Sequence, residues 1–392
     1  MPYNGILVIF TQPLPLTLYV HYPWCVQKCP YCDFNSHTLK KTVDEAAYIE
    51  AMITQLQGIL PQIWGRPIRS IFFGGGTPSL ISEEGLSRFL SQARALLGFS
   101  PDIEITLEAN PGTVDFEKFA GFYQAGINRL SMGIQSFDNE KLGVLGRIHS
   151  ADEAHLAIES AKSAGFKNFN LDLMFALPNQ TLEQAIADVE QALSYQPPHL
   201  SHYQLTLEPN TPFYKNPPVL PNDDQAWAFQ QACQEVIANA GYKHYEVSAY
   251  AQPGKQAFHN LNYWQFGDYI GLGAGAHGKI TMAPEGRIFR TQMPASPGGY
   301  VEAMKKTNGG RTHWLEEDDV VFEFMLNALR LQNGFDLNLF GLRTGLALSL
   351  IEPTLKQLLD QQLISISDAN WLQLTIKGQT FLNNVVSAFL NE

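Results

Sequence analysis

The chain has 392 residues, enough for two or three domains, and its 45 % hydrophobic and 16 % charged residues exclude a disordered protein. The 26 Lys and Arg against 38 Asp and Glu leave a net charge of −12, which disfavours partners bound through a basic surface, such as nucleic acid or anionic lipid. No apolar run approaches the ~18 residues of a membrane-spanning helix, and no signal peptide is recognisable. We therefore expect a cytoplasmic protein, with residues 1–15 as a loose leader.

Strand-like and helix-like segments alternate along the first half of the chain. Short apolar and β-branched runs occur at 16–21, 68–73, 103–108, 129–134, 169–174 and 200–207. Helical periodicity fills the intervals at 43–60, 83–97, 115–125, 151–164 and 182–193. This alternation predicts an α/β fold with a parallel sheet and helical crossovers, either open or closed into a partial barrel, but not the full eightfold barrel.

Polar residues stand at the carboxyl ends of these runs. They include His21, the Gly74–Thr77 stretch, Glu108, Gln135 and Thr206, and Asp172 interrupts the fifth run. Functional sites of parallel α/β folds lie at the carboxyl ends of the strands, and polar residues at the end of nearly every strand predict a site there.

The second half of the chain is predicted to complete the barrel and to add a further domain. Prolines between 209 and 221 mark a break, followed by a predicted helix at 223–240, a strand at 242–248, a Gly-rich stretch at 267–278 and a loop-rich stretch at 286–310. From 315 the pattern is mainly helical with a small hairpin, as in a winged-helix module. Ten acidic against four basic residues in 315–392 favour packing or partner docking over DNA binding. The predicted units are thus 16–212, 213–314 and 315–392.

Three of the four cysteines cluster in a C-x3-C-x2-C pattern formed by Cys25, Cys29 and Cys32. Thiolates suit both zinc, with His21 or His37 as a fourth ligand, and a 4Fe–4S cluster that keeps one iron open. The cluster is favoured, because the cysteines directly follow a predicted strand and no second C-x2-C knuckle exists. Cys233 falls in a helical pattern and is interpreted as a core residue.

Three cysteines at this spacing, on the first loop of a partial α/β barrel, resemble the radical S-adenosylmethionine (SAM) superfamily. The resemblance implies a partial (β/α)6 TIM-like barrel in which Cys25, Cys29 and Cys32 hold a 4Fe–4S cluster and SAM chelates the fourth iron. Further motifs are similar to the oxygen-independent coproporphyrinogen III oxidase group, from about residue 16 to the C-terminus. They are Tyr19–Cys25, Gly74–Pro78, Glu108–Pro111, Arg129–Phe137 and Asp172–Pro178.

The same resemblance implies which residues surround SAM. Gly75, Gly76 and Thr77 would bring backbone groups close to the methionyl amine, where side-chain bulk is not tolerated. Tyr19 and Tyr31 would border the methionyl part beside the cluster. The remaining contacts would come from Glu108, Gln135, Arg147 and Asp172, with Arg147 suited to the methionyl carboxylate and the others to ribose.

The group contains oxidases and a heme-chaperone branch, the HemW type, and three features favour the chaperones. Oxidases resemble C-x3-C-x2-C-x-C, whereas here Phe34 replaces the last cysteine and Phe34–His37 matches the chaperone pattern F-N-S-H. The segment before Tyr19, 18 residues, is short for an oxidase. The chaperone pattern H-N-x-x-Y-W appears as His259–Trp264, where His259 would ligate heme iron and the aromatic residues would stack on the macrocycle.

The resulting prediction is a heme chaperone that binds heme, SAM and a 4Fe–4S cluster and delivers heme to an acceptor hemoprotein, such as a membrane-associated respiratory enzyme. On this interpretation the protein has no coproporphyrinogen oxidase activity and binds no nucleic acid. The sequence does not decide between a monomer and a homodimer. The alternative is an oxygen-independent coproporphyrinogen III oxidase, and a more remote one is a zinc-bearing interaction protein.

Overall fold

The structure is a computed structural model that describes residues 10, 12–39, 43–63, 65–306 and 309–390. Within these residues, twelve strands form one curved sheet in the order β14-β13-β12-β11-β1-β4-β5-β6-β7-β8-β10-β9. Six parallel strands make its centre: β1 (Leu16–Tyr22), β4 (Ile68–Gly75), β5 (Phe99–Ala109), β6 (Arg129–Gln135), β7 (Phe169–Phe175) and β8 (His199–Gln204). The predicted α/β partial barrel is confirmed.

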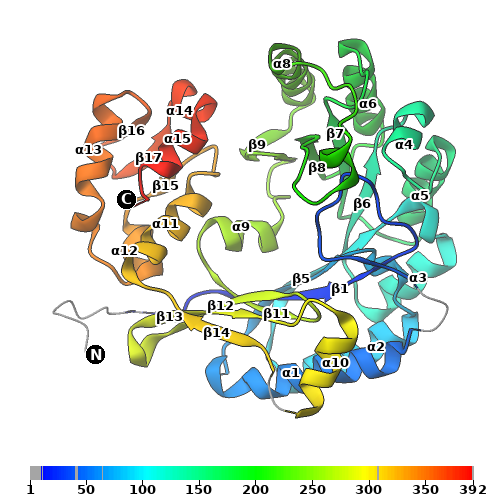
Figure 1. Cartoon of the computed structure of the whole chain (residues 1–392), viewed down its shortest axis with the longest axis horizontal. Coiled ribbons are helices and arrows are strands. Elements are labelled where there is room, and N and C mark those ends of the chain that lie inside the picture. Colours follow the sequence, from blue (N-terminus) through cyan, green and yellow to red (C-terminus); the bar gives the residue numbers. More distant parts are fainter. Residues whose placement is uncertain (1–9, 11, 40–42, 64, 307–308, 391–392) are drawn as a thin grey trace.

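Helices cover the outer face of this sheet, as Figure 1 shows for α1 to α6. The bounds of these covering helices are α1 (Glu45–Ile63), α2 (Glu83–Leu96), α3 (Phe116–Ala125), α4 (Asn139–Val144), α5 (Ala151–Ser163), α6 (Leu182–Ser194) and α8 (Asp223–Asn239), whereas the short helix α7 (Pro212–Lys215) contacts Pro30 through the amide of Phe213. Several begin at polar N-caps, for example Ser150, which forms a reciprocal capping box with Glu153 and so satisfies two free amides. Their apolar faces build one core with the strands.

Further strands extend both edges of the parallel sheet. On one edge β11 (Asp268–Leu272) pairs parallel with β1, and β12 (His277–Met282), β13 (Arg287–Gln292) and β14 (Arg311–Trp314) follow antiparallel. On the other edge lie β10 (Ala249–Ala251) and β9 (Lys243–Glu246). The prediction of a loop-rich stretch at 286–310 was wrong, because β13 and α10 (Pro297–Lys306) occupy it. Its glycines and prolines stand mainly at the ends of these elements.

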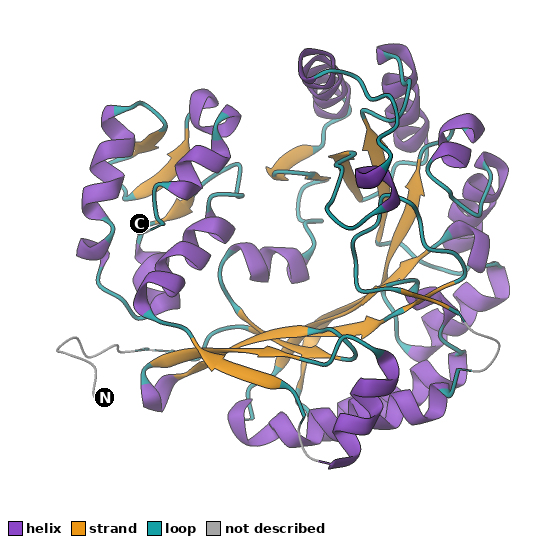
Figure 2. Cartoon of the chain, viewed as in Figure 1, coloured by secondary structure: helices purple, strands orange, loops and turns teal. Residues whose placement is uncertain are grey.

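The C-terminal part forms a separate layer with its own core, on the left in Figure 2. It contains α11 (Glu317–Ala328), α12 (Asn338–Thr344), α13 (Glu352–Asp360), α14 (Ile376–Thr380), α15 (Leu382–Ser387) and a small sheet of β15 (Phe335–Asp336), β16 (Ile364–Ile366) and β17 (Trp371–Leu374). Between this layer and the barrel lies the short helix α9 (Phe258–Trp264). Trp264 of α9 packs against the C-terminal core.

The expected loose leader lies mostly outside the described residues, which omit 1–9 and 11. Within the described part, Leu14 is buried and its carbonyl accepts a hydrogen bond from Arg66, so the segment that enters β1 is anchored. No helix among the described residues combines the length and the apolar character needed to cross a membrane.

Candidate functional site

The cysteine loop runs between two short paired strands, β2 (Trp24–Cys25) and β3 (His37–Thr38), above the carboxyl ends of the barrel strands. Asn35 anchors it, since its amide donates to the carbonyl oxygens of Ala274 and Ala295, each at 2.9 Å. Nε2 of His21 donates to the carbonyl of Asn35 at 2.8 Å. The F-N-S-H segment therefore ties the loop to β1 and to the β11 side of the sheet.

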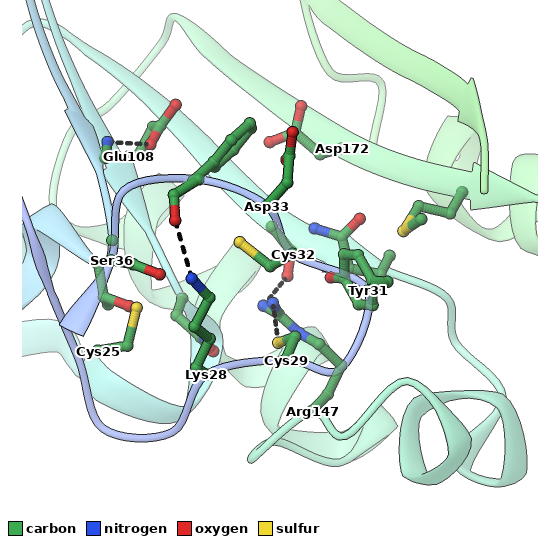
Figure 3. A pocket seen from close by; sticks show the side chains of 18 of the residues that line it. Cys25, Lys28, Cys29, Tyr31, Cys32, Asp33, Ser36, Glu108, Arg147 and Asp172 are labelled. Carbon is green, nitrogen blue, oxygen red and sulfur yellow. Dashed lines mark hydrogen bonds between the residues drawn. The ribbon is translucent and has the colours of Figure 1, made fainter. Parts of the chain in front are cut away.

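The three clustered cysteines line one cavity of about 530 Å³ (Figure 3). Cys25 is buried, and Cys29 and Cys32 are half-buried. Burial raises the pKa of the Cys25 and Cys32 thiols above the ordinary value. The positive charge of the nearby Lys28 ammonium opposes this rise but does not cancel it. Lys28 is held over the loop by a hydrogen bond to the carbonyl oxygen of Phe34.

The strand ends below the loop supply the polar wall of the same cavity. Gly75, Gly76 and Thr77 follow or end β4, Glu108 lies in β5, Gln135 ends β6 and Asp172 lies in β7, and all of them line the cavity. Gln135 has a φ of 70°, a left-handed conformation that is costly for a residue with a side chain. Its side-chain oxygen accepts a hydrogen bond from Tyr203 at 2.7 Å, which holds it against the cavity.

Arg147 and Tyr31 flank Cys29 beside the end of β6 (Figure 3). The guanidinium of Arg147 lies 3.7 Å from Sγ of Cys29 and donates to the carbonyl of Gly133 at 2.8 Å. Its Nε is buried and has no hydrogen-bond partner in the described structure. A buried donor without an acceptor is costly, so this wall is suited to an anionic group of a ligand.

The two carboxyl groups of the cavity differ in their surroundings. Burial, and secondly the nearby Asp172, raise the pKa of Glu108 to about 8, although the Gly75 amide donates to it at 3.2 Å. Burial also raises the pKa of Asp172, but hydrogen bonds from Asn170 and Ser131 oppose that shift. Glu108, with a pKa of about 8, therefore changes its charge near neutral pH.

The glycines after β4 are required for a different reason than the sequence suggested. A side chain at Gly76 would meet the carbonyl oxygen of Trp24 at 2.6 Å, and one at Gly75, which has a φ of 122°, would meet the ring of His21 at 2.8 Å. The glycines thus let this turn lie flat against β1 and β2. A side chain at either glycine would therefore clash with other parts of the protein and would not project into the cavity.

Tyr19 does not line the cavity. Its hydroxyl lies 2.9 Å from Nδ1 of His21, and its ring stacks on Phe72 and approaches His259 at 6.5 Å. Tyr19 therefore supports the cysteine loop through His21, from the barrel interior. Side-chain alternation along β1 places it on that inner side.

His259 lies in the barrel interior, on α9 rather than on a loop, and is 1 % exposed. Its Nδ1 is 2.8 Å from Oγ of Ser70, and its Nε2 is 3.1 Å from the hydroxyl of Tyr263. Both ring nitrogens therefore have partners, and neither is free to ligate iron in this conformation. Burial, helped by the charge of Arg129, lowers the pKa of His259 to about 3, so the ring is neutral.

The candidate fourth ligands for zinc have other partners. His21 makes the two hydrogen bonds described above, and His37 lies 3.3 Å from the carbonyl oxygen of Ala295. In the described part of the chain, no group of three or more His, Cys, Asp or Glu side chains could hold a metal ion as it stands. Cys233 is buried in the core on α8.

The residues behind Asp172 were not predicted from the sequence. Asn170, Ser131 and His199 form a buried network with it, and Tyr203 orients Gln135. The signal was present, because Asn170 with Asp172, and His199 with Ser201 and Tyr203, recur at period two on neighbouring strands.

A three-cysteine loop above a glycine turn and polar strand ends, on a partial α/β barrel, defines a radical SAM protein, and residues 19–192 match the Radical SAM superfamily. Residues 315–381 match the HemN C-terminal domain. The chain is 47 % identical to the heme chaperone HemW of Escherichia coli over 96 % of this chain and 99 % of that protein. The Haemophilus influenzae protein of the same name is 47 % identical over 96 % of this chain and 98 % of its own length. The Bacillus subtilis protein of that name is 34 % identical over 95 % of this chain and 99 % of its own length. The chain belongs to the HemW family.

A solved structure of the Escherichia coli coproporphyrinogen III oxidase HemN superposes with a TM-score of 0.80, at 22 % identity over 97 % of this chain and 91 % of that one. That likeness concerns the fold. The family implies a 4Fe–4S cluster and SAM, and the cavity fits both groups. It offers three thiols as soft ligands, room for a cofactor, carboxylate and amide groups, and an unpartnered guanidinium nitrogen.

Proposed function

We propose that this chain is a cytoplasmic heme chaperone that binds heme and a SAM-chelated 4Fe–4S cluster and delivers the heme to an acceptor hemoprotein. The observation that carries this proposal is the 47 % identity, over nearly the whole length of both proteins, to a heme chaperone. Phe34, which stands in place of the further cysteine expected of an oxidase, is 62 % exposed at the mouth of the cavity and supports the same choice.

In this proposal Cys25, Cys29 and Cys32 hold the cluster, which when bound and reduced supplies an electron to the sulfonium of SAM. Arg147 pairs with the methionyl carboxylate through its unpartnered side, beside Tyr31. Glu108, Gln135 and Asp172 contact the ribose and sulfonium end, and the turn Gly75–Thr77 supplies backbone groups. Tyr19 acts indirectly, by holding His21 under the cysteine loop.

The proposed heme ligand is His259, within the segment His259–Trp264. Ligation requires one of its two hydrogen bonds to open, and the bond to Tyr263 is the longer at 3.1 Å against 2.8 Å for Ser70. Ser70 then keeps the ring oriented, because a hydrogen bond to the other ring nitrogen fixes the orientation of a metal-bound imidazole.

Heme titration of the purified protein tests this assignment. The wild type is expected to bind heme with a Soret band that His259→Ala weakens or shifts. His202→Ala is the matched control, because His202 is also buried, has a pKa lowered by burial to about 3 as well, and stacks on Phe175 of β7. An unchanged spectrum and affinity in His259→Ala would contradict the ligand assignment.

Porphyrin analysis under reducing, anaerobic conditions separates the chaperone from the oxidase. The cluster-loaded protein is expected to leave coproporphyrinogen III unconverted. Formation of protoporphyrinogen at rates typical of an enzyme, about 1 per second or more, would favour the oxidase.

A further inference from the structure

A continuous row of hydrogen bonds runs from the cavity into the barrel interior. Asp172, in the cavity wall, lies 2.7 Å from Nδ2 of Asn170, and Oδ1 of Asn170 lies 2.7 Å from Nδ1 of His199. Nε2 of His199 lies 2.7 Å from the hydroxyl of Tyr245. That hydroxyl oxygen accepts a bond from the backbone amide of Ala257 at 3.4 Å. The row therefore ends at the N-terminus of α9, the helix that carries the proposed heme ligand.

The direction of every bond in this row follows from the carboxylate at its end. An ionised Asp172 only accepts, so the NH2 group of Asn170 faces it and the amide oxygen faces His199. Nδ1 of His199 must then carry the proton, and Nε2 accepts from the Tyr245 hydroxyl. Burial keeps His199 neutral by lowering its pKa well below the ordinary value. All donors point toward Asp172, and bonds aligned in this way strengthen one another.

The start of α9 depends on side chains from the barrel. Its N-cap residue, Ala257, has no side chain that can cap the helix. The Ala257 amide donates to Tyr245, and the amides of Phe258 and His259 donate to the carboxylate of Glu104 at 3.2 Å each. A change at the Tyr245 hydroxyl therefore acts directly on the first turn of α9.

We propose that Asn170, His199 and Tyr245 are positioning residues that couple occupation of the SAM cavity to the conformation of α9 and to heme binding. This inference rests on the proposed function. A ribose hydroxyl that donates to Asp172 competes with Asn170 for the same oxygens, which weakens the first bond of the row and the polarisation of the later ones. By linkage, heme must change the affinity for SAM by the same factor as SAM changes the affinity for heme.

The test compares two isosteric deletions of a buried hydroxyl. Tyr245→Phe breaks the row at its last side chain. Tyr242→Phe is the control, because Tyr242 is similarly buried but donates to the carbonyl of Pro197, outside the row. The dissociation constant of SAM is measured on cluster-reconstituted protein with and without heme. Backbone hydrogen exchange of the peptide 257–264 is measured with and without SAM.

In the wild type and in Tyr242→Phe, heme is expected to change the SAM dissociation constant at least about fivefold, and SAM to change exchange in 257–264. In Tyr245→Phe the effect on affinity should fall below about twofold, and the exchange response should disappear, while each ligand still binds. His199→Phe breaks the row at a second point and should give the same loss.

Three results would overturn the coupling. They are unchanged coupling in Tyr245→Phe, equal loss in Tyr242→Phe, and a wild type in which SAM leaves exchange in 257–264 unaltered. A wild type that binds no heme contradicts the proposed function instead, and the exchange measurement with SAM alone still decides whether the row couples the cavity to α9.

Discussion

Raising the pH from 6.5 to 8.5 is expected to tighten SAM binding through Glu108. Burial and the neighbouring Asp172 raise the pKa of this carboxyl to about 8, so at pH 7 about 0.9 of the ligand-free molecules carry the proton. A bound sulfonium cation favours the ionised carboxylate. Binding at neutral pH therefore releases this proton, and the affinity rises with pH until the ligand-free protein is itself ionised.

If Glu108 is fully ionised in the complex, its contribution should raise the affinity of the wild type about 25-fold between pH 6.5 and 8.5, in addition to the rise that Glu108→Gln shows, and should level off above about pH 9. Calorimetric titrations in two buffers of different ionisation enthalpy measure the released protons directly. Glu108→Gln is the control, because it removes this carboxyl while the amino group of SAM, with an ordinary pKa of ~8, still titrates. Equal proton release and equal pH slopes in both proteins would refute the reasoning.

The same group sets a pH dependence of stability without ligand. The folded protein keeps this proton up to about pH 8, whereas an unfolded chain loses it near 4.5. Stability should therefore fall as the pH rises through that window, since the folded state binds more protons there. Urea titrations of Glu108→Gln should lack this part of the decline.

Three further changes have defined outcomes. Replacement of Cys25, Cys29 or Cys32 by Ala should abolish iron and sulfide after anaerobic reconstitution, whereas Cys233→Ala, in the α8 core, should retain both; stoichiometric zinc in the wild type would contradict the cluster. Gly76→Ala should lower the melting temperature and weaken SAM binding, because its Cβ would lie 2.6 Å from the Trp24 carbonyl oxygen; Gly143→Ala, whose Cβ meets nothing within 4 Å, should change neither, and equal behaviour of the two would refute the steric argument. Asp268→Ala should lower the free energy of unfolding in urea titrations by about 3–5 kcal/mol, because Lys279 and Arg66 lose the carboxylate that they contact at 2.9 and 2.8 Å. Asp102→Ala, at an exposed position, should change it by less than about 0.5 kcal/mol. An equally small change for Asp268→Ala would show that the two ion pairs are dispensable.

Local patterns were sufficient to predict the barrel and one side of the site. The runs at 68–73 and 169–174 became β4 and β7, because β-branched and apolar residues between helical segments specify buried parallel strands. Glu108, Gln135 and Asp172 meet in one cavity because parallel strands end at the same edge of a sheet. That these three side chains lie close together can therefore be predicted without knowing any side-chain contact. The antiparallel strands β12 to β14 were missed, since short strands among glycines and prolines carry little local signal.

Contacts between residues far apart in the chain were decided only by the tertiary structure. Tyr19 was expected at the cofactor but supports His21, because it lies two residues earlier on β1, level with Phe72 and deeper in the barrel than the cavity. His259 was expected to ligate heme iron, which needs a free ring nitrogen, but α9 inserts the ring between Ser70 and Tyr263. The sequence by itself determined the ligand types, the alternation of strands and helices around them and the family pattern, because these depend on spacing along the chain. Which face of a strand each side chain occupies, and which distant group satisfies a buried donor such as Nδ1 of His199, depends on packing that no local segment contains.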